Sequence, residues 1–453
     1  MSFQKTIKEF DSYSAGFNVE FQGVNIWPYL RFYSLDKLHF KTDRKAKVGG
    51  KKAAGLIKNL FYGFRFWFGK FESIVFMASS DRRLYNGKWT EKTDFLPQYI
   101  GNTLFVELPN KGHFPIEEIP NKQVSSKVFL LLLEKIVEKF ISTPNEVLEI
   151  QSEIEKKYSI EANLSSIYKQ FAARYYVTRF FGQRMKVKNA VIDAAYVDMP
   201  RVLALKKLGA RVIEMQHGTI NDEHHGYQIY NDFNKLLFPD KLLCFGSMDK
   251  DFFKSSTYID YNDVFEVGSY YLEYINNSNP ISIQYESIRK NHPLLIAITG
   301  QDAYDDVLIE FINEVLEEKP EWGVIFIPRT ENENFYRKKY ELNNNIHFVN
   351  NLNTYELIKL CDIHTTVNST CALESVAIGT PNVLFDYNKK ASSYLSHLLT
   401  DLKSNSFCTT AKEFVLAVEN EHSLIPEEVL NLNSSLFALG YSNNLKSFFK
   451  SVS

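Results

Sequence analysis

The sequence predicts an α/β protein made of two doubly wound, Rossmann-like domains that face a cleft. Apolar runs typical of buried parallel strands alternate with helical patterns in the first half of the chain. The alternation restarts after a polar, proline-containing stretch at 276–292. With 453 residues, 45% of them hydrophobic, the chain can bury more than one core. We therefore expect an N-terminal domain over 1–275, a linker over 276–292 and a C-terminal domain over 293–453.

Short patterns place the elements of the N-terminal half. A first buried strand is predicted by "FESIVFMASS" (71–80). Charge-patterned segments with helical periodicity predict a helical insertion of two to four helices at about 120–185. A strand–helix–strand unit follows, formed by "NAVIDAAY" (189–196), a helix that ends near Gly209, and "ARVIEMQ" (210–216).

The C-terminal half repeats the same alternation. The predicted strands are "LLIAITG" (294–300), "WGVIFIPR" (322–329), "DIHTTVN" (362–368) and "TPNVLFD" (380–386). Helical patterns separate them, which is typical of a parallel sheet with helices on both faces.

Composition narrows the class of protein. A net charge of −2 and a pI near 6.6 provide no field that would attract nucleic acid. The four cysteines form no C-x-x-C pair, which indicates free thiols in a reducing cytoplasm. The first residues lack the apolar core of a signal peptide, and no run of about 18 apolar residues could span a bilayer. We expect a cytoplasmic protein that binds no nucleic acid.

One segment, 41–70, is rich in lysine and arginine and becomes aromatic in its second half. It is consistent with a solvated loop that precedes a core helix. It is also consistent with a patch that holds the protein on the inner face of the cytoplasmic membrane, where basic residues contact anionic headgroups and aromatic rings the interface.

Several nucleotide and catalytic motifs are missing. The chain has no G-x-G-x-x-G fingerprint, no P-loop, no G-x-S-x-G and no H-E-x-x-H. No D-x-D follows a predicted strand, which argues against a nucleotide held through a metal ion. We expect neither a metal ion nor a cofactor.

The segment 362–386 suggests a phosphate site. A strand leads into Asn368, Ser369 and Thr370, and a helix with Glu374 follows. Side chains of this kind cap a helix start, and its free N–H groups attract anions. Glu374, about one turn into the helix, could reach ribose hydroxyls. A capped helix of any α/β protein would have the same spacing.

A second candidate site follows the strand at 210–216, which ends in Gln216, His217 and Gly218. In an open parallel sheet, ligands bind beyond the carboxyl ends of the strands. An imidazole there can accept a proton from a sugar hydroxyl or donate a hydrogen bond to phosphate, and Gly218 lets a ligand approach the backbone. The alternative for His217 is a structural histidine.

The adjoining loop "NDEHHGY" is a weaker candidate. Adjacent histidines point in different directions, so we predict no metal site there. Either Glu223 and His225 contact a bound substrate, or the loop is simply polar.

Three further groups come at predicted strand ends. Arg329 could pair with a diphosphate in a forked geometry. The turn Thr299, Gly300 and Gln301 would face the phosphates of a bound nucleotide, although an ordinary turn fits as well. The remaining group, expected on the acceptor side or in a surface turn, is Asp81, Arg82 and Arg83.

Together these motifs resemble those of GT-B glycosyltransferases. The segment 362–386 is similar to their nucleotide-sugar-binding element. The N-terminal half resembles the transferases of bacterial capsule and O-antigen synthesis through "GVNIWPYLR", "SSDRRLYNGKW", "GARVIEMQHGT" and "FPDKLLCFGSMDKDFF". The resemblance implies a nucleotide-sugar donor in the C-terminal domain, a lipid-linked glycan acceptor in the N-terminal domain, and a last segment, 444–453, that crosses back to the first domain.

Three alternatives stay open: a sugar 2-epimerase, a polyol-phosphate transferase of the teichoic-acid type, and a non-catalytic capsule-assembly protein. Related transferases with CMP-linked acidic sugars often carry a histidine before the proline at the strand end. Here Ile327 precedes Pro328, which puts a CMP-linked donor in doubt.

Overall fold

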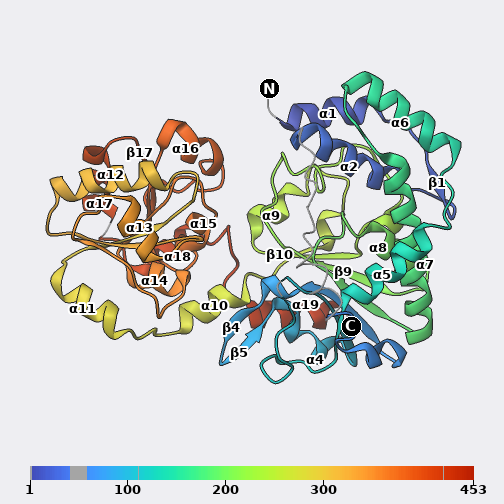
Figure 1. Cartoon of the computed structure of the whole chain (residues 1–453), viewed down its shortest axis with the longest axis horizontal. Helices are drawn as coiled ribbons and strands as arrows, with labels where there is room; N and C mark the ends of the chain where they lie inside the picture. The colour runs from blue at the N-terminus through green and yellow to red at the C-terminus, as the bar shows by residue number, and fades with distance from the viewer. Residues whose placement is uncertain (1–2, 41–58, 111, 422, 453) are drawn as a thin grey trace. The chain divides into compact units, whose positions relative to one another are not determined.

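A computed structural model describes residues 3–40, 59–110, 112–421 and 423–452 (Figure 1). No helix in these ranges is both long and apolar enough to cross a bilayer. The basic part of the predicted membrane patch, 41–58, lies outside the described residues.

The chain divides into two compact units. Unit 1 comprises Met1–Val267 with Asn444–Ser453, and unit 2 comprises Gly268–Asn443. The division therefore comes before the predicted linker at 276–292. Those residues contain a helix, α11 (Ile283–Asn291), which Ser282 caps by accepting a hydrogen bond from the backbone N–H of Tyr285.

A seven-stranded parallel sheet forms the centre of unit 1. Its strands are β3 (Ser73–Ala78), β6 (Thr103–Leu108), β7 (Val124–Ser126), β8 (Asn189–Ile192), β9 (Arg211–Met215), β10 (Lys241–Cys244) and β11 (Val264–Glu266). Their order across the sheet is β11-β10-β9-β8-β3-β6-β7. Along the chain the order reverses between β3 and β8, so the connections after these two neighbours run to opposite sides and leave a crevice at their carboxyl ends.

Helices cover both faces of this sheet, and the predicted helical insertion is confirmed. The insertion consists of α5 (Lys127–Glu138), α6 (Asn145–Tyr158) and α7 (Leu164–Met185). The other helices of the unit are α1 (Phe3–Tyr13), α2 (Trp27–Phe40), α4 (Pro97–Ile100), α8 (Met199–Lys206), α9 (Ser247–Phe252) and most of α19 (Tyr441–Val452). Burial on both faces explains why β3 carries an unbroken apolar run rather than an alternating one.

The last helix packs on unit 1. The ring of Phe449 stacks on Tyr99 with 4.7 Å between centroids, and Phe448 meets Phe265 at 4.8 Å. Two short hairpins also belong to this unit: β1 (Glu20–Phe21) with β2 (Val24–Asn25), and β4 (Arg83–Tyr85) with β5 (Lys88–Thr90).

Unit 2 has a six-stranded parallel sheet of the same kind. Its strands are β12 (Leu295–Thr299), β13 (Gly323–Ile327), β14 (Ile346–His347), β15 (Ile363–Thr365), β16 (Asn382–Phe385) and β17 (Asn405–Cys408). The order is β14-β13-β12-β15-β16-β17, with the reversal between β12 and β15. The carboxyl ends of these two strands therefore flank the second crevice.

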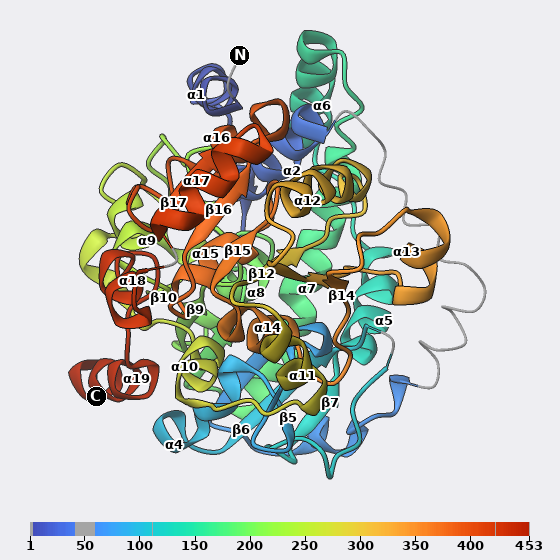
Figure 2. The ribbon, with the colours of Figure 1, turned by 90° about the vertical axis from the view of Figure 1, so that its left-hand side faces the viewer.

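The helices of unit 2 lie on both sides of its sheet (Figure 2). On one side, α12 and α17 share an apolar core in which Phe311 stacks on Phe385, with centroids 3.9 Å apart. The helices are α10 (Tyr270–Asn277), α11, α12 (Asp305–Glu318), α13 (Glu333–Lys339), α14 (Thr354–Leu360), α15 (Cys371–Val376), α16 (Lys390–Leu395), α17 (Ala411–Glu421) and α18 (Pro426–Leu432). The sheet thus has the doubly wound architecture that the sequence predicts.

A glycine fixes the segment that leads into β3. Gly63 has φ +64°, and a Cβ there would lie 1.8 Å from the carbonyl oxygen of Val124 on β7. The backbone of Ser126 donates a 3.0 Å hydrogen bond to Tyr62 O. Residues 59–64 are thereby held closely against the edge of the sheet.

We expect Gly63→Ala to lower the free energy of unfolding by about 3 kcal/mol or more, since it adds a clash to backbone strain. Gly87→Ala is the matched control, because Gly87 has φ +74° but open space where a Cβ would lie. Gly87→Ala should lower the free energy of unfolding by about 1 kcal/mol. Equal losses in urea unfolding would contradict a specific contact at residue 63.

Candidate functional site

Three polar residues meet at the crevice of unit 1. Asp81 ends the turn after β3, Asp193 follows β8, and His217 follows β9, so each comes from one of three adjacent strands. Their possible ligand atoms all lie within 4.8 Å of one another. The Nδ1 atom of His217 lies 3.8 Å from Oδ2 of Asp81, and the His217 side chain is 51% exposed. The predicted positions of His217 and Asp81 at one sheet edge are thus found together.

A lysine completes this group. The Nζ atom of Lys92 lies 3.0 Å from Oδ1 of Asp193 and donates a 2.9 Å hydrogen bond to Gln216 O. Burial lowers the pKa of Lys92, but the carboxylates of Asp193 and Glu91 outweigh burial, and the pKa is raised. Lys92 therefore carries a fixed positive charge. Neither Lys92 nor Asp193 was predicted from the sequence.

The same three ligand atoms have a donor set that a divalent cation could accept. The ammonium of Lys92 lies against the carboxylate of Asp193, and His217 is half-exposed on one side of the group. Lys92 therefore supplies a positive charge beside Asp193.

Gln216 has a structural role in this unit. Its Oε1 accepts a 2.7 Å hydrogen bond from Phe245 N, and its Nε2 donates to Gly218 O at 2.9 Å. The side chain is buried, so it ties the ends of β9 and β10 together instead of contacting an acceptor. Gly218 is exposed, and a Cβ there would meet no atom within 4 Å. Space for a ligand exists beside its backbone.

The prediction that Arg82 contacts an acceptor is wrong. Its guanidinium is buried and pairs with Asp94 and Glu107, each at 2.7 Å. In this turn Asp81 and Arg83 flank Arg82, whose side chain points inward. Arg83 is exposed, and its guanidinium donates to the carbonyl oxygens of Ser80 and Arg82.

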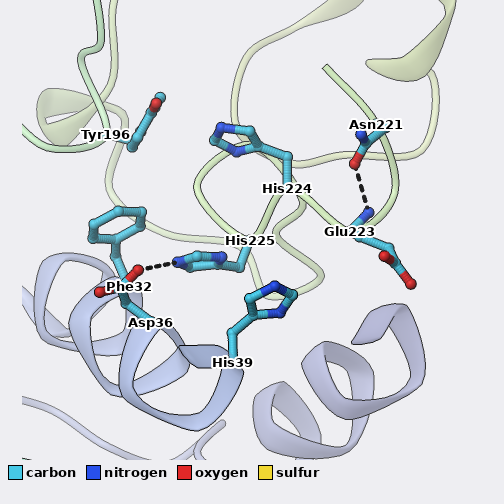
Figure 3. A pocket seen from close by; sticks show the side chains of 8 residues that line it. All are labelled: Phe32, Asp36, His39, Tyr196, Asn221, Glu223, His224 and His225. Atoms are coloured by element: carbon cyan, nitrogen blue, oxygen red, sulfur yellow. Dashed lines mark hydrogen bonds and ion pairs between the residues drawn. The ribbon is translucent and has the colours of Figure 1, made fainter. Parts of the chain in front are cut away.

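A cavity of about 370 Å³ lies beside the loop that carries the paired histidines (Figure 3). It is walled by helix α2, the turn after β8 and residues 221–225. The lining residues are Phe32, Asp36, His39, Tyr196, Asn221, Glu223, His224 and His225. Among these described residues there is no lysine or arginine, and two are carboxylates, so the cavity disfavours phosphate and suits hydroxyl groups.

His225 and Glu223 thus line a cavity, as a substrate contact would, but both also have structural partners. The His225 ring stacks on Phe32 with centroids 4.7 Å apart, and its Nε2 lies 4.0 Å from Asp36 Oδ1, beyond hydrogen-bond distance. The Oε1 atom of Glu223 accepts a 3.0 Å hydrogen bond from Phe3 N.

Both histidines are neutral at physiological pH. Burial lowers the pKa of His224 to about 4 and, together with the nearby His224, Arg31 and His39, lowers that of His225 to about 3. The loop is held by Arg31, whose guanidinium donates 2.7 Å hydrogen bonds to His225 O and Gln228 O. Arg31 ends the motif "GVNIWPYLR", so the structure explains that motif as a clamp on the histidine loop.

The turn after β12 in unit 2 is internally satisfied. Thr299 and Gly300 are buried, and the N–H of Gly300 donates to Ile327 O at 2.9 Å. The N–H of Gln301 donates to Oδ1 of Asp305 at 2.7 Å. These two backbone N–H groups are therefore occupied within the protein, and the prediction that this turn faces phosphates stays a prediction.

The side chain of Gln301 instead links the two strand ends at the reversal. Its Nε2 donates to Asn368 Oδ1 at 2.6 Å, and its Oε1 accepts from Asn368 N at 3.0 Å. Beneath them, buried His364 bridges Thr299 Oγ1 and Asn382 Oδ1 at 3.0 and 2.8 Å, and burial lowers its pKa to about 4. This neutral histidine, which the sequence analysis missed, fixes the floor of the crevice.

The polar groups that face outward at this crevice are Arg329, Thr370 and Ser369. Arg329 and Thr370 are exposed, and Ser369 Oγ accepts a 3.3 Å hydrogen bond from Cys371 N. The helix that follows, α15, has only six residues, so its dipole is weaker than the sequence suggested. Glu374 is half-buried in its first turns and lies close enough to raise the pKa of the Cys371 thiol, after burial as the main cause.

Comparisons with known proteins give the fold. No family model and no curated sequence matches the chain. It is similar to the UDP-GlcNAc 2-epimerase from Methanocaldococcus jannaschii, at 12% identity and TM-score 0.53 over 84% of this chain and 99% of that one. A putative UDP-N-acetylglucosamine 2-epimerase from Listeria monocytogenes is also similar, at 8% identity and TM-score 0.51 over 84% of this chain and 96% of that one. So is the glycotransferase of kitacinnamycin, at 10% identity and TM-score 0.50 over 85% of this chain and 98% of that one. Two Rossmann-like domains of the GT-B type are therefore confirmed.

We expect Arg82→Met to lower the free energy of unfolding by about 3–5 kcal/mol, because it leaves two buried carboxylates without their partner. Arg83→Met, at the exposed neighbouring residue, should change the free energy of unfolding by no more than about 0.5 kcal/mol. Urea unfolding of both variants measures the difference. A small effect at residue 82 would mean that Asp94 and Glu107 are not held by this ion pair.

We expect His225→Phe to make unfolding stability less sensitive to acid. Below pH 6.5 the His225 side chain binds a proton in the unfolded chain. In the folded protein its pKa is about 3, so it stays unprotonated, and the free energy of unfolding of the wild-type protein therefore falls as the pH is lowered. The free energy of unfolding of the variant, relative to that of the wild-type protein, should rise by about 2 kcal/mol from neutral pH to about pH 5. His397→Gln, on an exposed histidine, is the control and should leave the profile unchanged.

Proposed function

We propose that this protein is a glycosyltransferase that moves a sugar from a nucleotide-sugar donor to a glycan acceptor in bacterial surface polysaccharide synthesis. One observation carries the proposal. In each Rossmann-like unit, polar residues come together around the carboxyl ends of the strands where the order reverses: Asp81, Asp193 and His217 in unit 1, and Gln301 with Asn368 in unit 2. That is where open α/β sheets bind nucleotides and sugars. The GT-B fold has room for both substrates.

Unit 2 is assigned the donor. Arg329 is exposed at the end of β13 and makes no ion pair with any of the described residues, so its guanidinium is available to a diphosphate. The hydroxyls of Ser369 and Thr370 can donate to the same oxygens, since a hydroxyl both accepts and donates. Glu374, one turn further, would accept from ribose hydroxyls. Gln301 and Asn368 position the two turns and need not touch the ligand.

Unit 1 is assigned the acceptor and the base. As the acceptor oxygen bonds to the anomeric carbon, the bond from that carbon to the diphosphate oxygen breaks, and the diphosphate leaves with the electron pair. The acceptor proton passes to His217, whose positive charge Asp81, at 3.8 Å from Nδ1, would stabilise. Lys92, 3.0 Å from Asp193 Oδ1, orients that carboxylate at the same crevice. We propose that this chemistry requires no metal ion.

The cavity beside Glu223 and His225 suits a further sugar of the acceptor. Neutral imidazoles and carboxylates can hydrogen-bond to hydroxyls, while Phe32 and Tyr196 offer flat apolar faces. The absence of lysine and arginine among its described lining residues favours an uncharged or amino sugar over a phosphate. A lipid-linked diphosphate would have to lie elsewhere on unit 1.

Thermal shifts against UDP, GDP, dTDP, CMP and CDP, with and without Mg²⁺, test the donor assignment. A nucleotide at about a hundred times its Kd should stabilise the protein by about 2.7 kcal/mol. We expect a shift with one nucleotide, unchanged by EDTA, and weakened about tenfold or more in affinity by Arg329→Ala. Lys338→Ala, on an exposed basic residue of the same unit, is the matched control.

The variants also separate the alternatives. His217→Ala should keep nucleotide binding and lose about a hundredfold or more in transfer rate. Conversion of a UDP-sugar without any acceptor would favour a 2-epimerase. A shift with CDP or CMP alone would favour a polyol phosphate or an acidic sugar as the transferred group. No shift with any nucleotide would contradict the proposal and favour a non-catalytic assembly protein.

A further inference from the structure

Exposed phenylalanines of this protein are concentrated in one part of unit 1. Among the described residues five phenylalanines are exposed, and four of them come from the segment before β3, from the turn that follows helix α5 and from helix α7. Their exposed fractions are 67% for Phe61, 55% for Phe68, 82% for Phe140 and 61% for Phe180. Such clustering is unusual for a surface that faces only water. Three other large apolar side chains of these elements are exposed as well: Leu132, Ile136 and Tyr176.

These side chains adjoin one another through ring contacts. Phe64 lies 6.0 Å from Phe61 and 5.3 Å from Phe68, measured between ring centroids. It also contacts Phe129, 4.9 Å away in the first turns of α5. Ile136 follows Phe129 by seven residues, close to two helical turns, so both lie along one side of α5, and Phe140 follows in the turn after the helix ends at Glu138. The exposed stripe of α5 therefore starts at the phenylalanines before β3.

The stripe on α7 reaches the same place. Tyr176, Phe180 and Arg184 are spaced by four residues and lie on one face of the helix. The guanidinium of Arg184 lies 5.6 Å from the ring centroid of Phe68, and Lys70 donates a hydrogen bond to Arg184 O. We call the seven exposed apolar side chains the phenylalanine face: Phe61, Phe68, Leu132, Ile136, Phe140, Tyr176 and Phe180.

The backbone that carries Phe61 is anchored rather than loose. Gly63 packs directly on Val124, Tyr62 O accepts from Ser126 N, and the Tyr62 ring stacks on His113 with 4.1 Å between centroids. The aromatic rings are thus presented from a fixed platform. Because the fold already orders this segment, little further conformational entropy is lost when a partner buries the rings.

The charge of the surrounding surface is positive. The described stretches 59–70, 129–141 and 176–188 contain eight lysines and arginines and two glutamates. One glutamate, Glu134, is buried against Arg201, and the other, Glu138, pairs with Lys135 at 2.6 Å. The exposed cations include Arg65, Lys139 and Lys186. A complementary partner is apolar at its core and anionic at its surface.

We infer that the phenylalanine face docks unit 1 on an anionic membrane surface, with the rings inserted at the boundary between headgroups and acyl chains and the cations among the headgroups. Aromatic side chains and a basic fringe have this division of roles at membrane interfaces. The inference does not depend on residues 41–58 or on the catalytic proposal. It would place an acceptor that is itself a lipid within reach of the protein.

Co-sedimentation of the full chain with vesicles tests the inference. We expect binding to vesicles of phosphatidylglycerol and phosphatidylethanolamine, and much weaker binding to phosphatidylcholine alone. The double substitution Phe140→Ser with Phe180→Ser should lower the partition coefficient at least about tenfold. Arg184→Glu should weaken binding at low salt and have less effect at high salt.

Ile281→Ser with Ile283→Ser is the matched control, because these side chains of unit 2 are 82% and 88% exposed. The control should bind vesicles as the wild-type protein does. Equal binding by the wild-type protein and both double variants would overturn the inference. So would a wild-type protein that ignores vesicles but self-associates through the same phenylalanines, as measured by light scattering. Nucleotide thermal shifts, unchanged in the serine variants, keep this test separate from the catalytic one.

Discussion

The geometry of both units depends on one constraint, the reversal of strand order in a parallel sheet. Parallel strands require crossover connections of a single hand, so a sheet that grows in both directions from its first strand sends two neighbouring connections to opposite faces. Between β3 and β8, and again between β12 and β15, no connection covers the strand ends. Polar side chains can lie there without entering a core, and this is where His217, Asp81 and the Gln301–Asn368 pair are found.

Most strands of the two sheets could be predicted because burial on two faces leaves unbroken apolar runs, whereas the strand order and its reversal points come only from the structure. Three strands of the two large sheets were not anticipated, β6 (Thr103–Leu108), β7 (Val124–Ser126) and β17 (Asn405–Cys408), the last of which has serine and asparagine in its short run. The candidate site was predicted only in part. Strand ends located His217 and Asp81, but the turn alone did not show that Arg82 points inward. Lys92 reaches the site from a helix after the β4–β5 hairpin, a contact that only the tertiary fold creates.

The two crevices differ in the charged groups at their strand ends. In unit 1, Lys92 keeps an ion pair with Asp193, which suits a site that moves protons. In unit 2, the floor is a neutral histidine between a hydroxyl and an amide oxygen, and Arg329 is an exposed cation at the strand end. Because His364 is neutral, it adds no charge that would weaken the electrostatic attraction between the Arg329 guanidinium and a bound anion.

The discontinuity of unit 1 has a consequence for synthesis on the ribosome. Unit 2 is one uninterrupted stretch, whereas unit 1 is completed only by the last ten residues of the chain. Arg31 likewise finds the carbonyl of His225 only after another 194 residues have been made. At roughly 5–20 residues per second, the apolar faces of α1 and α2 wait about 10–40 seconds for their partners. During that interval the nascent N-terminal helices are candidates for chaperone binding, and α19 can dock on unit 1 only after unit 2 has been synthesised.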